Sequence, residues 1–170
     1  MLNSRFSEQE LIKIAEQVAQ KSISYDYRTK DYPLEVIRTK FGQENNPQAT
    51  LYIPNYQRKF VWKPDRQSKF IESVLLGTPL TPFLVAEDEN NRLEIIDGSQ
   101  RIQTLVRFCN NELSLITLKI LSSLNSAKFS DLPRRLQRFI ENRDFRVIVL
   151  NNKADISIRK DIYNRLNTSN

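Results

Sequence analysis

The spacing of apolar residues along this chain alternates between a helical repeat and short continuous runs, and these two patterns predict its elements. Near the N-terminus, Ser7 and Glu10 have the spacing of a capping box and indicate where a first helix begins. The apolar face of this helix carries Leu11, Ile14, Ala15, Val18 and Ala19. We expect this face to pack as a lid or to form a surface for a partner.

Further helices are predicted where apolar residues recur every three or four positions between capping and terminating residues. They begin at Pro64 or Asp65, after Gly98, at Asp131 and at Asp155. The first of these is expected to end at Gly77, because a glycine commonly follows the last turn of a helix. The helix from Asp131 is expected to run through Ile140.

Short apolar runs predict strands at residues 51–53, 83–87, 93–97, 113–121 and 145–150. The segment 34–41 fits a helix or a strand, 42–47 has the composition of a loop, and 21–33 is expected to be extended or irregular. Since strands and helices alternate without a regular βαβ repeat, we predict an α+β fold with a small mixed sheet and flanking helices. The 170 residues are expected to form a single domain, 1–170, whose segment 1–50 is a helix with an irregular extension.

Charged residues are in modest basic excess, with 26 Lys and Arg against 20 Asp and Glu and a formal net charge of +6. This excess is compatible with a polyanionic partner and equally with an ordinary solvated surface. The absence of histidine excludes HNH-type nuclease sites, histidine-based triads and histidine zinc sites from this chain. Any chemistry must use carboxylates, Arg, Lys, Tyr, Ser or a recruited metal ion.

The single cysteine, Cys109, falls in the helix predicted after Gly98 and is expected to be a small core residue. No apolar run has the length of a membrane span, and the first residues lack the apolar segment of a signal peptide. We therefore expect a cytoplasmic protein that does not contact a membrane.

The segment 95–101 is the best candidate for chemistry, because an apolar strand ends in Asp97 and Gly98 just where a helix begins. The first turn of a helix presents unpaired N–H groups and the positive end of its dipole, both of which suit a phosphate. Arg101 can donate to phosphate oxygens, and Asp97 can hold a magnesium ion or orient a water. In the alternative interpretation, Asp97 simply caps the helix and Arg101 pairs with a nearby acid.

Three motifs strengthen the first interpretation: Ile-Pro-Asn-Tyr-Gln-Arg at 53–58, Asp-Gly-Ser-Gln-Arg at 97–101, and Arg-Leu-Asn at 165–167. In this order they resemble the N-terminal domain family of GmrSD-type restriction systems. The resemblance implies a ParB/sulfiredoxin-like nucleotide-binding fold and nucleoside triphosphate (NTP) binding, with hydrolysis in several members. It also implies a role in modification-dependent restriction and phage defence.

The resemblance further implies a set of site residues. Asp97, Gln100 and Arg101 would be the catalytic residues, acting at the phosphates of a Mg²⁺–NTP complex, with Asp97 also as the metal ligand. The other nucleotide-binding residues would be Tyr56, Gln57, Arg58, Gly98, Ser99, Arg165 and Asn167. Ser99 departs from the usual Gln of the family, and its hydroxyl can donate to a phosphate without the reach of an amide.

Several of these residues also have structural interpretations. Val61 and Trp62 are expected to be core residues, because large apolar groups beside a bend usually pack. The ring of Tyr56 offers a stacking face for a base, or it belongs to the same core. Arg165 and Asn167 fit a partner of the helix dipole and a C-cap as well as they fit a ligand site.

Three functions remain open from the sequence. The first is a nucleotide-dependent switch or weak NTPase, with a separate nuclease effector subunit as its partner. The second is a DNA-binding module that uses exposed Tyr and Arg side chains, including Arg134, Arg135 and Arg138 of one basic helix. The third is a protein-interaction module with a vestigial nucleotide pocket. A complete nuclease is not expected in this chain.

Overall fold

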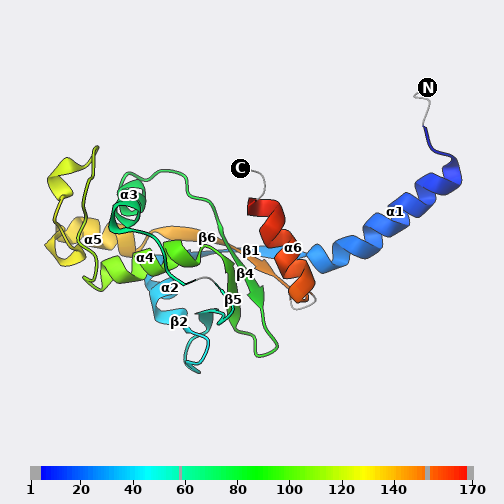
Figure 1. Cartoon of the computed structure of the whole chain (residues 1–170), viewed down its shortest axis with the longest axis horizontal. Helices are drawn as coiled ribbons and strands as arrows, with labels where there is room; N and C mark the ends of the chain where they lie inside the picture. The colour runs from blue at the N-terminus through cyan, green and yellow to red at the C-terminus, as the bar shows by residue number, and fades with distance from the viewer. Residues whose placement is uncertain (1–4, 58, 152–153, 168–170) are drawn as a thin grey trace.

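A computed structural model describes residues 5–57, 59–151 and 154–167 of the chain. Its strands are β1 (Tyr27–Pro33), β2 (Phe41–Gln43), β3 (Leu51–Ile53), β4 (Phe83–Glu87), β5 (Leu93–Asp97) and β6 (Asp144–Leu150). Its α-helices are α1 (Glu8–Ser22), α2 (Leu34–Lys40), α3 (Pro64–Leu75), α4 (Ser99–Cys109), α5 (Arg134–Glu141) and α6 (Ile156–Asn167). The predicted α+β fold class with flanking helices is confirmed (Figure 1).

The six described strands form one mixed sheet in the order β1-β6-β4-β5-β3-β2. Strand β6 is antiparallel to β1 and parallel to β4, and β4 is antiparallel to β5. The remaining pairs, β5 with β3 and β3 with β2, are parallel. Since β3 pairs with only the first residues of β5, the end of β5 that leads into α4 has no strand on that side.

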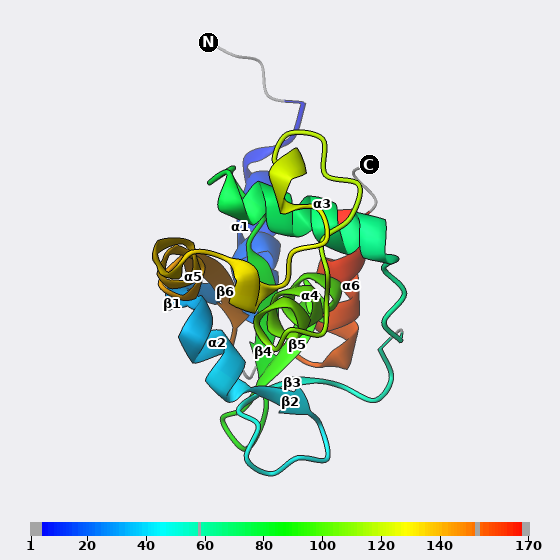
Figure 2. The same ribbon diagram turned by 90° about the vertical axis from the view of Figure 1, so that its left-hand side faces the viewer.

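Both faces of the central strands are buried, which explains their continuous apolar sequences. In β4, Phe83 and Val85 belong to a core formed with α2, α3, α4 and α5, the helices gathered nearest the viewer in Figure 2. The alternate residues Leu84 and Ala86 belong to a second cluster, against which Ile158 and Ile162 of α6 pack. Helix α6 therefore covers the face of the sheet opposite to the other packed helices.

Helix α1 stands away from the rest of the chain (Figure 1). The predicted capping box is confirmed, because the Ser7 hydroxyl accepts from the Glu10 N–H and the Glu10 carboxylate accepts from the Ser7 N–H. None of its residues is buried, and Leu11, Ile14 and Val18 are all exposed. The helix therefore does not act as a lid here, while a role as a partner surface remains a prediction. No helix in the described ranges is long and apolar enough to cross a membrane.

The strand predicted at 113–121 is wrong, because this segment is a loop bonded to α3, with only some of its side chains buried. Its backbone N–H groups are satisfied by side chains: that of Ile116 by the Ser68 hydroxyl, and those of Ile120 and Leu121 by the Glu72 carboxylate. The apolar alternation that suggested a strand instead buries Leu113, Leu115 and Leu118 in the core.

Other boundaries also differ from the predictions. The extended conformation expected within 21–33 is found in β1, although residues 21–22 belong to α1, and part of the predicted loop after residue 41 is β2. Asp131 does not cap a helix but ends a short 3₁₀ turn, and α5 begins after Pro133, whose fixed φ suits a helix start. The predicted cap at Asp155 is confirmed, since its carboxylate accepts from the Ile158 N–H.

Candidate functional site

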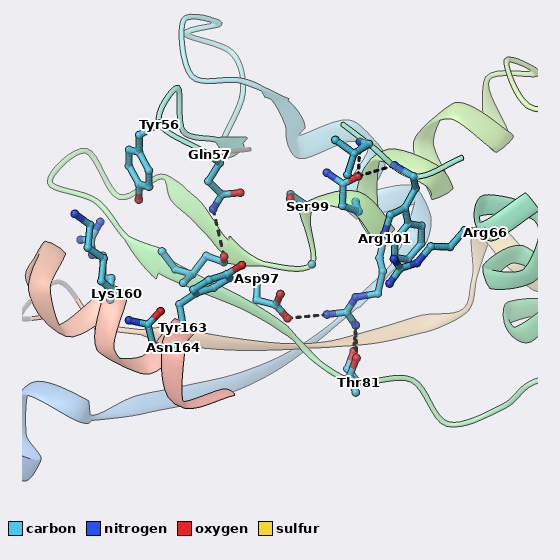
Figure 3. A pocket seen from close by; sticks show the side chains of 16 residues that line it. Tyr56, Gln57, Arg66, Thr81, Asp97, Ser99, Arg101, Lys160, Tyr163 and Asn164 are labelled. Atoms are coloured by element: carbon cyan, nitrogen blue, oxygen red, sulfur yellow. Dashed lines mark hydrogen bonds and ion pairs between the residues drawn. The ribbon is translucent and has the colours of Figure 1, made fainter. Parts of the chain in front are cut away.

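A cleft of about 840 Å³ lies where β5 ends and α4 begins. Among the described residues, its walls come from five parts of the chain: the loop after β3, the start of α3, the segment before β4, the β5–α4 junction, and α6 (Figure 3). Most of the predicted site residues line it, namely Tyr56, Gln57, Asp97, Gly98, Ser99, Gln100 and Arg101. The fold thus brings together two of the three motifs that were separate in the sequence.

The β5–α4 junction depends on Gly98. This residue has a φ of 102° at the N-cap of α4, a conformation that side chains rarely adopt. A Cβ added there would lie 2.5 Å from Cδ1 of Phe83, so the ring of Phe83 occupies the space that a side chain would need. No side chain caps α4 at Gly98 among the described contacts, and this end of the helix opens into the cleft. The glycine is therefore explained by backbone geometry and packing.

Arg101 is held by the protein itself. One terminal nitrogen donates to the carbonyl and hydroxyl of Thr81, and the other donates to the Pro82 carbonyl at 3.1 Å and to Asp97 Oδ2 at 3.1 Å. Its guanidinium also lies over the Phe83 ring, 4.9 Å from the centroid. Burial lowers the pKa of Arg101, and the Asp97 carboxylate opposes this shift. Arg101 thus fixes Asp97 and the segment before β4, which matches the predicted alternative of an ion pair with a nearby acid.

Gln100 connects α4 to the loop after β3. Its side-chain carbonyl accepts from the Val61 N–H at 2.8 Å and the Trp62 N–H at 3.2 Å, and its amide nitrogen donates to the Lys59 carbonyl at 3.3 Å. These bonds use the whole amide to position this wall of the cleft. Gln100 therefore acts on backbone groups of the protein in this structure, where the sequence indicated a catalytic role.

The side chain of Gln57 makes hydrogen bonds to the end of β5, where β3 no longer pairs with it. Its amide nitrogen donates to the carbonyl oxygens of Ile95 and Ile96, in the part of β5 that does not pair with β3. Pro54 directs the chain away from β5 just before this point, so a side chain must complete the pairing. Gln57 consequently stabilises the strand that carries Asp97.

Tyr56 is exposed over 63% of its surface and presents its ring at the cleft. Its hydroxyl donates to the carboxylate of Glu94, which is 8% exposed and also pairs with Arg159 of α6 at 2.6 Å. Burial raises the pKa of Glu94, and the charge of Arg159 opposes this shift. This buried pair, together with Tyr56, joins α6 to the sheet. Neither Glu94 nor Arg159 was predicted, because the two lie 65 positions apart in the sequence.

Helix α6 contributes Arg159, Lys160, Tyr163 and Asn164 to the cleft, all absent from the predicted site. The residues predicted from this helix behave differently. Arg165 pairs with Asp161 one turn earlier at 2.8 Å and does not line the cleft.

Two other predicted residues cannot be placed. The side chain of Asn167 and the whole of Arg58 lie outside the described residues.

The opposite wall is formed by Trp62 and Arg66. The Trp62 ring makes an edge contact with Phe70, at 5.7 Å between centroids, and the Arg66 guanidinium lies 4.5 Å from the Trp62 centroid. Trp62 is half-buried, which agrees in part with its predicted packing role, whereas Val61 is 47% exposed and is not a core residue. Arg66 follows Trp62 by one helical turn, a spacing that could have indicated the stacked pair.

The lining of the cleft is strongly cationic. Of the residues that the structure describes, four cations line it, Arg66, Arg101, Arg159 and Lys160, against one carboxylate, that of Asp97. Two of these cations are already paired with carboxylates, while Arg66 and Lys160 have no ion pair within the described ranges. The electrostatic character of the cleft thus favours an anionic ligand.

Among the described residues, Asp97 is the one carboxylate that lines the cleft, and a carboxylate oxygen suits a hard cation. Its side chain is 35% exposed, and one of its oxygens is engaged by Arg101. The described residues contain no group of three or more His, Cys, Asp or Glu side chains that could enclose a metal ion. A Mg²⁺ ion here would therefore take one protein carboxylate and fill its shell with phosphate oxygens and water, as is usual for Mg²⁺–NTP complexes.

Cys109 lies away from this cleft, and its burial raises the pKa of the thiol to about 11. We therefore expect no measurable modification by a thiol reagent at pH 7.5 in the folded protein, and complete modification in denaturant. A timed labelling experiment followed by mass spectrometry checks this. Modification of the native protein as fast as of the denatured chain would contradict it.

The mixed sheet and the cationic cleft at a helix start define an α+β domain with a site suited to a phosphate-bearing ligand. Residues 37–170 match the model of the family described as GmrSD restriction endonuclease, N-terminal domain. The chain belongs to this family, so the resemblance noted in the sequence is confirmed and the protein is a component of a restriction system. No curated protein and no solved structure gives a significant match.

Proposed function

We propose that this chain binds a Mg²⁺–NTP complex in the cleft and serves as the regulatory domain of a modification-dependent restriction system. In this proposal the nuclease is supplied by another domain or subunit, and the role is phage defence. Family membership supports the restriction context. The ParB/sulfiredoxin-like fold belongs to the same proposal, and the position of the cleft at the β5–α4 junction supports it.

One observation carries the proposal: the cleft combines an uncapped helix start, an excess of cations and one partly exposed carboxylate. Its volume of about 840 Å³ falls in the range of small-molecule sites. A triphosphate with Mg²⁺ matches these features, because its oxygens suit the N–H groups and cations while the metal needs a carboxylate. Bound Mg²⁺ would neutralise charge on the phosphates, and Asp97 would hold it.

The three predicted catalytic residues differ in what their side chains contact. Asp97 faces the cleft, whereas Gln100 and Arg101 use their polar groups to hold the loop after β3 and Asp97 itself. We therefore propose them as positioning residues for a binding site. In this proposal, binding and release of the nucleotide would act on α4 and α6, which pack on opposite faces of the sheet and both line the cleft.

Thermal unfolding with Mg²⁺ and each NTP tests the proposal. At a ligand concentration about 100 times Kd, the wild type should gain about 2.7 kcal/mol, which corresponds to roughly 5–10 °C in Tm. Chelating Mg²⁺ should remove most of this gain. In Asp97→Asn, which keeps an acceptor for Arg101, the gain should no longer depend on Mg²⁺, because the ligand for the ion is lost.

Asp144→Asn provides the control, since Asp144 is exposed at the start of β6 and does not line the cleft. This variant should respond to Mg²⁺–NTP as the wild type does. If no NTP stabilises the wild type, the proposal is wrong; if Asp97→Asn keeps the full Mg²⁺ dependence, Asp97 is not the metal ligand. Phosphate release measured in the same samples shows whether hydrolysis follows binding.

The basic helix α5 does not support a second function. Arg135 and Arg138 are exposed there, as expected for an ordinary solvated helix face. DNA binding and a pure protein-interaction role therefore remain predictions from the sequence.

A further inference from the structure

We infer that the cleft holds the nucleotide in one direction, with its polyphosphate toward Arg66 and the start of α4 and its base between Tyr56 and Tyr163. This inference rests on the proposed nucleotide binding and adds two ligand-contacting residues, Arg66 and Tyr163. Figure 3 shows Arg66 and Arg101 at one end of the cleft, Tyr56, Lys160 and Tyr163 at the other, and Asp97 between them.

Arg66 is the cation best prepared to meet a phosphate. Its guanidinium lies over the Trp62 ring, 4.5 Å from the centroid, a cation–π contact that engages no N–H group with a carboxylate. The backbone of Trp62 is itself fixed. Its N–H donates to the side-chain carbonyl of Gln100, and its carbonyl accepts from the side-chain amide of Gln67 at 2.8 Å. Arg66 has no carboxylate partner in the parts of the chain that the structure describes. The guanidinium of Arg66 is thus held in place, while its charge has no carboxylate partner among the described residues.

Arg101 could contact a phosphate only by breaking hydrogen bonds that it already makes. Both of its terminal nitrogens donate to the protein, to Thr81, Pro82 and Asp97. Moving it would leave these acceptors unsatisfied and would release Asp97 from its fixed position. The phosphate contact that the sequence suggested for Arg101 is therefore assigned to Arg66.

The other end of the cleft has the chemistry of a base-binding site. The ring of Tyr56 is largely exposed, and the bond from its hydroxyl to Glu94 fixes its position. Tyr163 on α6 is 44% exposed, and Asn164 beside it offers both a donor and an acceptor. Aromatic faces stack with any base, so this end favours a nucleotide over a bare polyphosphate.

Asp97 lies between the two ends, where the phosphates of a nucleotide bound in this direction would begin. A Mg²⁺ ion held by Asp97 would then contact phosphates that also reach the start of α4 and Arg66. In the reverse direction, the phosphates would lie against two tyrosine rings, with Lys160 and with Arg159, whose charge is already paired with Glu94.

The test compares two ligands, a nucleotide and inorganic tripolyphosphate, by isothermal titration calorimetry with Mg²⁺. All four NTPs are titrated into the wild type, and the tightest is used with the variants. Arg66→Ala should weaken the NTP and tripolyphosphate alike, by about tenfold or more, since a charge-assisted phosphate contact is lost. Tyr163→Ala should weaken the NTP by about tenfold but change tripolyphosphate binding less than about twofold, because only stacking is lost.

Lys69→Ala is the matched control for Arg66, because it removes a cation from the same helix outside the cleft. It should leave both ligands within about twofold of the wild type. Tyr163→Phe keeps the ring and should bind the NTP as the wild type does. Thermal unfolding of each variant shows that it is folded.

Two results would overturn the inferred direction. One is an Arg66→Ala variant that behaves like Lys69→Ala, and the other is a Tyr163→Ala variant that loses tripolyphosphate as strongly as the NTP. Binding of no NTP by the wild type is a different result, because it removes the proposed function itself.

Discussion

Gly98→Ala is expected to lower the free energy of unfolding by about 3 kcal/mol, roughly 6–12 °C in Tm, and to abolish NTP binding at the cleft. Two costs combine at this position. The φ of 102° is unfavourable for any residue with a Cβ, and the new methyl group would meet the Phe83 ring at 2.5 Å. Relief of this clash must move either the Phe83 ring, which packs against Phe145 and the Arg101 guanidinium, or the start of α4, which lines the cleft.

Gly77→Ala separates these two costs. Gly77 also has a positive φ, 73°, but an added Cβ would meet nothing within 4 Å. This variant should lose only about 1 kcal/mol and should keep NTP binding. Chemical denaturation of both variants measures the difference. Equal losses of stability would show that contact with Phe83 is not the reason for glycine at the β5–α4 junction.

Arg159→Met is expected to lower the free energy of unfolding by about 3 kcal/mol at pH 7.5, because it leaves the buried carboxylate of Glu94 without its cation. The double variant Arg159→Met/Glu94→Gln should recover most of this loss, since the uncompensated charge is gone. Arg146→Met is the control: Arg146 pairs with Asp31 on the exposed side of the sheet, with side chains 61% and 46% exposed, and should cost less than about 1 kcal/mol.

The cost of Arg159→Met should depend on pH in a defined direction. The pKa of Glu94 is raised in the folded protein, so the folded state holds a proton more tightly than the unfolded chain does. Stability therefore falls as pH rises from the unfolded value, about 4.3, through the raised folded value. Removing Arg159 raises the folded pKa further, so the variant should approach wild-type stability near pH 4. A loss that is constant with pH would show that Glu94 is not the cause.

Local signals in the sequence predicted most of the packed elements. The strands β4, β5 and β6 are short, mainly apolar runs with buried residues on both faces, and the capping residues Ser7 and Asp155 begin α1 and α6 as expected. The loop bonded to α3 was missed because its apolar alternation is that of a strand. Its backbone is satisfied by the side chains of Ser68 and Glu72, which no periodicity can indicate.

The candidate site was predicted in part, and the reason lies in how its residues are joined. Asp97, Gly98 and their neighbours form one short motif, so the sequence alone located the β5–α4 junction. The contribution of α6 comes through a tertiary ion pair between Glu94 and Arg159, and the stacked pair of Trp62 and Arg66 depends on where α3 begins. The sequence also could not show that Arg101 and Gln100 are engaged by backbone groups rather than open to a ligand.

The place of β6 in the sheet has a consequence for how the chain folds as it is synthesised. Strand β6 is the last strand in sequence, yet it lies between β1 and β4, so β1 reaches the rest of the sheet only through it. Until residues 144–150 have left the ribosome, β1 has no strand to pair with, and one edge of β4 is open. The sheet thus closes only when the final strand inserts, and a nascent chain that stalls earlier exposes an apolar strand edge prone to aggregation.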